Sequence, residues 1–306
     1  MEIHIADCTS NRPASGPTGY RLPTACRQAS GPLSSTDVIV GGRPYAPHVT
    51  SNDQAAELRR LHEHADLLVL VNVWDVASAK VVAGLPDCRA LATASHSVAA
   101  AYGYADGEQI PQDLMISAVE RIAGAVDLPV TADLEAGYGD VDATVRKAIA
   151  AGAVGGNIED QMRPLDESVD TMAAAIRAGE AEGVPFVLNA RTDAYLLAGD
   201  RDPDEVFADA VARGRAFLDV GADCVFVPGT SDAATIGRLV EQIGTRKVSV
   251  ILGPGSPSLA ELASLGVARA SCGPWTQWVA LTALADVGAS LLDGTGAIPE
   301  TTRPVG

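Results

Sequence analysis

The feature that most constrains the fold of this chain is an alternation of short apolar runs with longer helical patterns, repeated eight times between residues 67 and 292. Continuously apolar runs of strand length are typical of a parallel sheet that is buried on both faces by helices. The predicted strands are residues 67–73, 90–94, 129–132, 155–158, 185–189, 224–227, 248–252 and 268–271. The predicted helices that follow them are residues 76–83, 111–125, 141–151, 168–182, 203–220, 232–243, 258–265 and 275–292, and a further helix over 52–64 precedes the first strand.

Several predicted helices carry the expected residues at their ends. Asp202 and Pro203 form a typical helix start. Gly152, Gly221 and Gly266 each separate a helix from a strand, which indicates a left-handed cap in a short loop. The repeated units favour the α/β class and closure into a (β/α)8 TIM barrel. An open doubly wound sheet is the alternative, weakened because no Gly-x-Gly-x-x-Gly turn follows the first predicted strand.

Two segments lie outside the predicted barrel, which covers residues 51–292. Residues 1–50 are rich in Pro, Gly, Ser and Thr without sustained periodicity, and we expect an irregular extension that is flexible or loosely docked. Residues 293–306 are expected to form a C-terminal tail. The 47% hydrophobic content of the 306 residues is sufficient for one large core.

The charge and cysteine content exclude several classes of partner. A net charge of -17 argues against binding to nucleic acid or to an anionic membrane. A small anionic substrate is still compatible with it if a metal ion and an arginine reverse the local field. The five cysteines lack the short paired spacings of a disulfide framework or a zinc site. Without an apolar run of 18 residues or a signal-peptide pattern, the sequence predicts a cytoplasmic protein.

The acidic stretch from Thr131 to Gly139 is where we expect the chemistry. It extends an apolar strand, and alternation along a strand would place Asp133 and Glu135 on the same face. Two neighbouring carboxylates repel each other unless a cation lies between them. Mg²⁺, or Mn²⁺ in its place, is the hard divalent ion that such oxygen ligands suit. The structural alternative is a solvated strand end.

Polar residues follow each of the first five predicted strands. In a barrel of this kind the active site lies at the carboxyl ends of the strands, so these residues are expected to meet there. They are Asn72, Trp74 and Asp75; Ser95, His96 and Ser97; Asp133 and Glu135; Asn157, Glu159 and Asp160; and Asn189, Arg191 and Asp193. The last three strands end in loops rich in glycine and proline, so the predicted site is lopsided toward the first five strands.

Each candidate residue also has a purely structural interpretation. His96 could be a hydrogen-bonded core histidine, and Arg191 could neutralise a neighbouring aspartate in an ion pair. Ser95 and Ser97 could cap a helix, and Asp106 could be a turn residue before a glycine. Taken together, three carboxylates and one arginine at one barrel rim favour an anionic ligand held by a metal ion.

Several motifs resemble those of the isocitrate lyase/phosphoenolpyruvate mutase superfamily, over about residues 67–274. The motifs are Asn72–Ala79, Tyr102–Glu108, Thr131–Gly139, Asn157–Asp160, Asn189–Asp193 and Val227–Gly229. The resemblance implies a Mg²⁺-dependent barrel enzyme that makes or breaks C–C or P–C bonds of 2-oxo acids or related carboxylates through an enolate. It also implies homodimers or homotetramers that exchange the C-terminal helix.

The resemblance further implies roles for individual residues. Asp133, Glu135 and Glu159 would hold the Mg²⁺ ion, mostly through its waters. Arg191 would bind the substrate carboxylate or oxyanion, the backbone near Ser95, His96 and Ser97 would bind the carboxylate end, and Asp106 would lie at the reacting group. From their places at the strand ends, and not from the resemblance, we also expect Asn72, Trp74 and Asn189 to bind substrate. The enolate needs a proton donor, for which His96, Tyr104 or a metal-bound water are the catalytic candidates.

One loop departs from the resemblance and narrows the reaction. Residues 161–166 contain neither the Lys-Lys-Cys-Gly-His loop of isocitrate and methylisocitrate lyases nor the lysine and asparagine of the P–C enzymes. The prediction is therefore a Mg²⁺-dependent carbon–carbon lyase or decarboxylase of the oxaloacetate decarboxylase-like branch, acting on a small 2-oxo or 2-hydroxy dicarboxylate through a metal-stabilised enolate. The alternatives are a P–C mutase or hydrolase, an enzyme that cleaves a larger substituted acid in secondary metabolism, and a non-catalytic scaffold.

Overall fold

The protein is described by a computed structural model that covers residues 50–304, so the predicted extension before Thr50 lies outside the described residues. Within residues 50–304, nine strands form one sheet in the order β1-β9-β8-β7-β6-β5-β4-β3-β2. All neighbouring strands are parallel. The strands are β1 (Leu68–Leu70), β2 (Asn72–Val73), β3 (Leu91–Thr93), β4 (Val130–Asp133), β5 (Gly155–Glu159), β6 (Val187–Arg191), β7 (Cys224–Phe226), β8 (Val248–Ile251) and β9 (Arg269–Ser271).

The two ends of this sheet belong to one run of the chain. The first predicted strand, residues 67–73, is interrupted at Val71. Its first half, β1, pairs with β9, whereas its second half, β2, pairs with β3. The expectation of a single first strand was wrong in this detail. Residues 68–73 pair with β9 before Val71 and with β3 after it, at the place where the sheet closes on itself. The predicted barrel is confirmed as a nearly closed parallel barrel of the TIM type.

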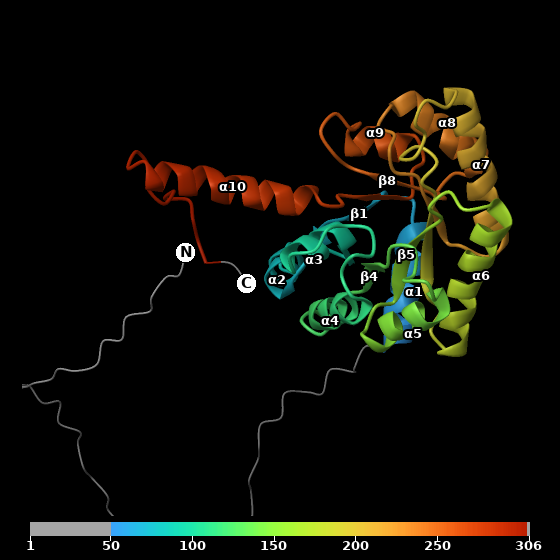
Figure 1. Cartoon of the computed structure of the whole chain (residues 1–306), viewed down its shortest axis with the longest axis horizontal. Helices are drawn as coiled ribbons and strands as arrows, with labels where there is room; N and C mark the ends of the chain where they lie inside the picture. Colours follow the sequence, from blue (N-terminus) through green and yellow to red (C-terminus); the bar gives the residue numbers. More distant parts are fainter. Residues whose placement is uncertain (1–49, 305–306) are drawn as a thin grey trace, which may run out of the picture. The chain divides into compact units, whose positions relative to one another are not determined.

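Helices surround this barrel and cover its outer face (Figure 1). The helices are α1 (Ser51–Glu63), α2 (Val76–Ala83), α3 (Ser95–Ala101), α4 (Gln112–Ala123), α5 (Val141–Ala150), α6 (Leu165–Ala181), α7 (Pro203–Asp219), α8 (Ala233–Ile243), α9 (Leu259–Ser264) and α10 (Trp275–Leu292). Helix α3 was not predicted, and α6 begins three residues earlier than expected. The remaining helices lie where the apolar periodicity placed them.

The predicted helix ends are also confirmed. The Asp202 carboxylate accepts a hydrogen bond from the Asp204 amide, with Pro203 in the first turn of α7. Gly152, Gly221 and Gly266 have φ of 93°, 107° and 82°, which is the left-handed conformation that glycine adopts without strain. These residues reverse the chain from helix to strand within a few residues and so set the short connections of the barrel.

Helix α1 covers the amino-terminal end of the barrel. Arg59 of α1 pairs with Asp223, just before β7, at 2.6 Å. Arg246, just before β8, donates to the carbonyl oxygens of His62 at 3.4 Å and Asp66 at 2.6 Å. These contacts fix α1 across the end of the barrel opposite the carboxyl ends of the strands, where a site is expected.

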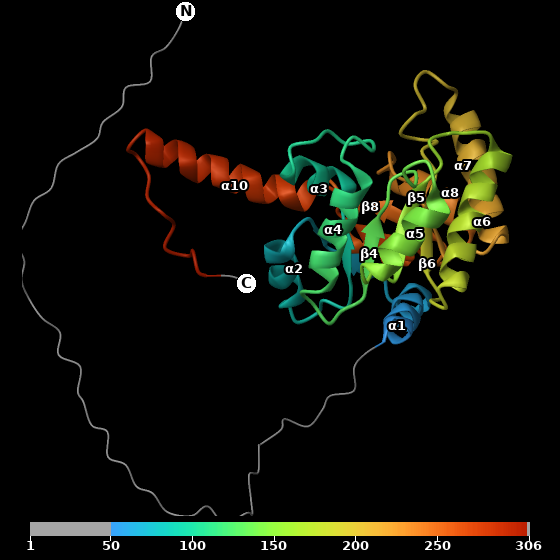
Figure 2. The same ribbon diagram turned by 60° about the horizontal axis from the view of Figure 1, so that its bottom comes forward.

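Helix α10 behaves differently from the other helices and extends away from the barrel in both ribbon views (Figures 1 and 2). Gln277, in its first turn, is its only buried residue. Large apolar side chains farther along are exposed, including Val279 at 69% and Leu284 at 67%. Among the described residues no helix combines the length and the apolar character needed to cross a membrane. The cytoplasmic location stays a prediction.

Candidate active site

A cavity of about 170 Å³ opens at the carboxyl ends of the strands. The predicted site residues that line it include Asn72 of β2, His96 and Asp106 from the segment after β3, Asp133 of β4 and Arg191 of β6. Ser95 and Asn157, also expected at the strand ends, line it as well. The structure therefore brings together residues that are far apart in the sequence, at the end of the barrel where they were expected.

Asp133 ends β4 and is held by the start of α3. Its Oδ2 accepts hydrogen bonds from the Ser95 amide at 3.0 Å and the Ser95 hydroxyl at 2.8 Å. The Asp133 amide in turn donates to Thr93 Oγ1 at 2.9 Å. The Ser95 hydroxyl lies 3.5 Å from the Asp106 carboxylate, so Ser95 stands between the two acidic groups. Ser95 is thus a structural link as well as part of the cavity lining.

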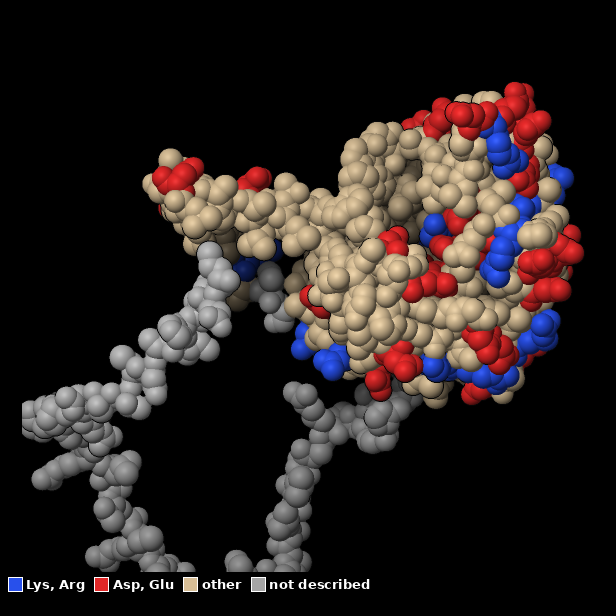
Figure 3. All heavy atoms as spheres, viewed as in Figure 1, with Lys and Arg blue, Asp and Glu red and all other residues tan. Residues whose placement is uncertain are grey.

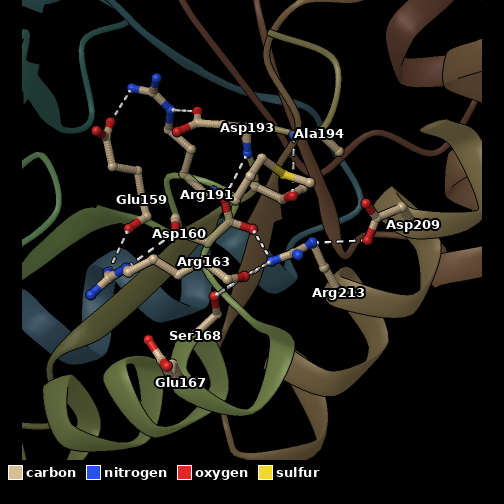
Figure 4. A network of polar contacts seen from close by, with 12 residues as sticks. Glu159, Asp160, Arg163, Glu167, Ser168, Arg191, Asp193, Ala194, Asp209 and Arg213 are labelled. Atoms are coloured by element: carbon tan, nitrogen blue, oxygen red, sulfur yellow. Dashed lines mark hydrogen bonds and ion pairs between the residues drawn. The ribbon is translucent and has the colours of Figure 1, made fainter. Parts of the chain in front are cut away.

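Arg191 ends β6 and pairs with two carboxylates (Figure 4). Its Nη1 lies 2.7 Å from Glu159 Oε2, and its Nε donates to Asp193 Oδ1 at 2.6 Å. Glu159 stands directly across from Arg191 in the register of β5 and β6. Although burial opposes the charged form of Arg191, the two carboxylates raise its pKa. The arginine stays a cation at the edge of the cavity.

Glu135 differs from the prediction. Strand β4 ends at Asp133, and Glu135 has a φ of 52°, so it lies in a turn and not on the strand face. The expectation that alternation would align it with Asp133 was wrong, because the chain leaves the extended conformation between them. Glu135 is 3% exposed, and its carboxylate accepts hydrogen bonds from the Glu108 amide and, at 3.2 Å, from the Tyr138 hydroxyl. The loop that contains Glu108 therefore closes over this carboxylate.

The three predicted metal ligands suit a divalent cation in their chemistry. Burial raises the pKa of Glu135 to about 7, and the charges of Asp133 and Asp106 add to the shift. Burial likewise raises the pKa of Glu159 to about 7, although Arg191 opposes this. Buried carboxylates with excess negative charge are stabilised by a hard cation. Within residues 50–304, however, no three acidic, histidine or cysteine side chains are gathered at metal-binding distance.

Asn72 and His96 line the cavity but differ in their partners. The Asn72 amide nitrogen donates to the Thr93 carbonyl at 2.7 Å, and its oxygen accepts from the amides of Cys272 and Gly273. Asn72 therefore ties β2 to the loop after β9. His96 packs edge-on against Trp278 of α10, with 5.3 Å between ring centroids, and its Nδ1 is buried without a hydrogen-bond partner. The ring of His96 is thus held by packing, and its Nδ1 has no hydrogen bond to another described residue.

The other predicted site residues lie outside the lining of this cavity. Trp74 packs in a cluster with Tyr138 and residues of α3 and α4. Ser97 is buried, and its carbonyl accepts a hydrogen bond from the Gln277 side chain. Asn189 is buried as well and donates to Asn157 Oδ1 at 2.9 Å. Tyr104 is 39% exposed. Glu135 and Glu159 are near-neighbours of the cavity and not part of its lining. Their roles in binding or catalysis stay predictions.

The rest of the cavity lining is mainly apolar, and the sequence did not single out these residues as lining. Phe226 belongs to β7 and Pro228 to the loop after it, Ile251 belongs to β8, and Leu196 lies in the loop after β6. Ser271 of β9 adds one hydroxyl group. Alternation along β7 and β8 could have identified Phe226 and Ile251 as inward-facing. Leu196 lies in a loop, and its position could not be read from any pattern.

A parallel barrel with an arginine and several carboxylates at the carboxyl ends of its strands belongs to the class of (β/α)8 enzymes. The chain belongs, within that class, to the phosphoenolpyruvate mutase/isocitrate lyase superfamily, because the family model described as phosphoenolpyruvate phosphomutase matches residues 58–292. The resemblance seen in the sequence is thereby confirmed. The superfamily includes C–C lyases and P–C mutases.

Individual relatives differ in their named activities. A solved structure of a candidate phosphonomutase from Burkholderia cenocepacia is 44% identical, with a TM-score of 0.74, and the match covers 78% of this chain and 100% of that one. Oxaloacetate decarboxylase of Paraburkholderia xenovorans is 28% identical over 76% of this chain and 80% of its own length. 2,3-Dimethylmalate lyase of Eubacterium barkeri is 28% identical over 69% of this chain and 77% of its own length.

Proposed function

We propose that the protein is a Mg²⁺-dependent carbon–carbon lyase or decarboxylase that acts on a small 2-oxo or 2-hydroxy dicarboxylate such as oxaloacetate. The observation that carries the proposal is the pairing of Arg191 with buried carboxylates beside a cavity that also contains Asp133 and His96. An arginine in this position can bind a substrate carboxylate and stabilise the negative charge that develops on the keto oxygen. The similarity to an oxaloacetate decarboxylase supports the assignment.

The division of roles follows from the chemistry of the side chains. Asp133, Glu135 and Glu159 would hold Mg²⁺, which would act as a Lewis acid toward the substrate oxygens. Arg191 orients the substrate carboxylate and shares the charge of the enolate. His96, with its unpartnered Nδ1, is within the cavity and is the better placed proton donor, since Tyr104 does not line it. Leu196 and Phe226 add apolar surface to the lining, which helps to exclude water from the bound substrate.

The apolar part of the lining favours a substrate that carries a small aliphatic substituent. Oxaloacetate offers no apolar group to Leu196, Phe226 or Ile251, which line the cavity together with the charged residues. A methyl-substituted acid would bury its substituent there, and each buried methylene contributes about 0.8 kcal/mol. The similarity to 2,3-dimethylmalate lyase supports this version of the proposal. The named phosphonomutase relative favours P–C chemistry as a second candidate, although residues 161–164 include no lysine or asparagine.

A metal-dependent substrate screen tests these proposals. Purified protein is incubated with oxaloacetate, with 2,3-dimethylmalate and with phosphonopyruvate, each in the presence of Mg²⁺ or of EDTA. We expect pyruvate from oxaloacetate, or cleavage of the methylated acid, and we expect EDTA to abolish either reaction. Turnover of phosphonopyruvate alone would replace the lyase with the P–C assignment. Absence of all three reactions would overturn the proposed function.

We further propose that α10 is exchanged between subunits of a homodimer or homotetramer. Its surface is largely uncharged along its length (Figure 3). An apolar hollow of about 440 Å³ lies at its base, lined by Leu252, Gly253, Pro254, Cys272, Trp275, Thr276 and Val279. Exposed apolar surface of this extent marks an interaction site. A second copy of the chain is the partner that the family resemblance implies.

Introducing a charge on α10 is expected to dissociate the assembly. Leu284 is 67% exposed in the described chain but would be buried between subunits, where Asp in its place would be an unpaired buried charge. Multi-angle light scattering should give a multiple of 31.4 kDa for the natural protein and a shift toward 31.4 kDa for Leu284→Asp. Leu85→Asp, at a site that is 51% exposed, is the matched control and should leave the mass unchanged. A natural protein that is monomeric would contradict the exchange.

A further inference from the structure

We propose that Asp160 and Arg213, which do not line the cavity, are positioning residues that fix Arg191 and the loop after β5 in their active arrangement (Figure 4). The proposal rests on the role given above to Arg191. The two side chains form an ion pair of 3.1 Å between the barrel and the outer helix α7. Asp160 is completely buried, and the Arg213 side chain is 8% exposed.

The Asp160 carboxylate connects two loops. Asp160 directly follows β5, and its Oδ1 accepts hydrogen bonds from the Met162 amide and the Asp193 amide, both at 3.0 Å. Met162 belongs to the loop after β5, whereas Asp193 belongs to the segment after β6. One carboxylate oxygen therefore fixes the chain at the ends of two neighbouring strands.

The contacts continue from this carboxylate to the cavity. Asp193, whose amide is held by Asp160, accepts a hydrogen bond from Arg191 Nε through its own carboxylate at 2.6 Å. Arg191 then reaches Glu159 with Nη1. The Asp160 amide also donates to the Arg191 carbonyl at 3.0 Å. Asp160 thus constrains Arg191 in two ways. Its amide holds the Arg191 carbonyl, and its carboxylate holds Asp193, the ion-pair partner of Arg191.

Arg213 joins the same loop to the helix layer. Its Nη1 lies 3.1 Å from Asp160 Oδ2, donates to the Arg163 carbonyl at 3.0 Å and lies 3.4 Å from Ser168 Oγ. Arg163 belongs to the loop after β5 and Ser168 to α6. The guanidinium therefore holds the beginning of α6 against α7, with the loop between them.

The loop that this pair holds has a strained backbone. Gln161 and Met162 have φ of 48° and 54°, which is the left-handed region that residues with a Cβ seldom adopt. Two consecutive residues in this conformation persist only where surrounding contacts impose it. The bond from the Met162 amide to Asp160 is such a contact. Gln161 also donates to Glu159 at 3.3 Å, so the strained segment reaches a predicted metal ligand.

Asp160→Asn tests the role of the negative charge while keeping the size of the side chain. The probe is oxalate, a small dicarboxylate that imitates the carboxylate end of the proposed substrate. In the presence of Mg²⁺ we expect Asp160→Asn to bind oxalate about tenfold more weakly than the natural protein does, since loss of a supporting contact typically costs tenfold or more. We expect kcat/KM to fall by about the same factor. Arg213→Lys should recover part of the affinity that Arg213→Gln loses, because it keeps the charge beside Asp160.

Asp209→Asn is the matched control. Asp209 accepts from Nε of the same arginine at 2.9 Å and pairs with Arg201 at 3.0 Å, but it contacts neither Asp160 nor the residues Met162 and Asp193 that Asp160 holds. Its replacement should leave oxalate affinity and kcat/KM within about twofold of the natural values, with thermal stability measured for every variant. A merely structural pair would lower the melting temperature of Asp160→Asn and leave oxalate affinity unchanged, which would overturn the proposal.

Crystal structures separate this proposal from the proposed function. If the natural protein neither binds oxalate nor turns over a 2-oxo acid, the proposed function fails. The positioning role is then decided by the Arg191–Glu159 contact in crystals of the natural protein and of Asp160→Asn. Displacement of Arg191 in the variant supports the role, and an unchanged contact overturns it. If Asp160→Asn does not fold, Arg213→Lys and Arg213→Gln provide the same comparison.

Discussion

Replacing Arg191 with alanine is expected to lower kcat/KM for the identified substrate by about 10²- to 10³-fold, the cost of removing a preorganised group that stabilises charge in a transition state. The guanidinium is the cation in the cavity lining, and it is already oriented by Glu159 and Asp193 at 2.7 and 2.6 Å. Because Glu159 and Asp193 already orient the guanidinium, little free energy is spent on orienting it when substrate binds. Most of its interaction with the substrate can therefore stabilise the transition state. Steady-state kinetics with the substrate found in the screen provides the measurement.

Two further variants make this result specific. Arg191→Lys keeps the positive charge but cannot reach both carboxylates with a planar fork, so we expect an intermediate loss. Arg201→Ala is the control, since Arg201 is a partly exposed arginine that pairs with Asp209 away from the cavity. An Arg191→Ala variant with a natural circular dichroism spectrum and natural kcat/KM would contradict the role of this arginine in the reaction.

The barrel could be predicted because its determinants are local and repeated. Each unit carries an apolar strand and a helix, and three of the connections contain a glycine whose positive φ the structure confirms at Gly152, Gly221 and Gly266. The interruption at Val71 could not be predicted in this way. It depends on β1 meeting β9, some 200 residues later in the chain, and no local pattern records that contact.

The candidate site was predictable as far as its residues lie on strands. Asp133 and Arg191 end β4 and β6, and their places directly after predicted apolar strands located both correctly at the carboxyl end of the barrel. Glu135 shows where this reasoning fails. It adopts a φ of 52° two residues beyond the end of β4, and its carboxylate is held by the backbone of Glu108. A strand model cannot describe a side chain whose direction is set by a turn and by a distant loop.

The two interpretations of Arg191 in the sequence also turn out to be compatible. An ion pair with Asp193 was the structural alternative to a role in substrate binding, and the structure confirms that ion pair. The same contact orients the guanidinium at the cavity, so the pair serves the proposed role instead of replacing it. A sequence shows that both charges are present, but the three-dimensional structure is needed to show that Asp160 holds the backbone of Asp193.

Acidification is expected to destabilise the protein through His62, at the end of the barrel opposite the cavity. His62 is 3% exposed, and its Nδ1 lies 2.8 Å from the Leu58 carbonyl. Burial, together with the charges of Arg269, Arg246 and Lys247, lowers the pKa of His62 to about 3. The unfolded chain has the ordinary histidine pKa of about 6.5, so it binds more protons than the folded protein between these values. His62 therefore contributes stability above pH 6.5 that is lost as the pH falls. At pH 5 the loss is about 2 kcal/mol.

The measurement is the free energy of unfolding in urea at pH 7 and pH 5 for the natural protein and for His62→Leu. The raised pKa values of Glu135 and Glu159 act in the opposite direction, because these buried carboxylates take up protons in the folded state more readily than in the unfolded chain. The prediction therefore concerns the difference between the two proteins. The loss of stability between pH 7 and pH 5 should be about 2 kcal/mol smaller in His62→Leu. His64→Leu, at a half-exposed position on the same end of α1, should retain the natural pH dependence. Equal pH dependence in all three proteins would show that His62 accepts its proton in the folded state without cost, for example because α1 opens locally at the end of the barrel.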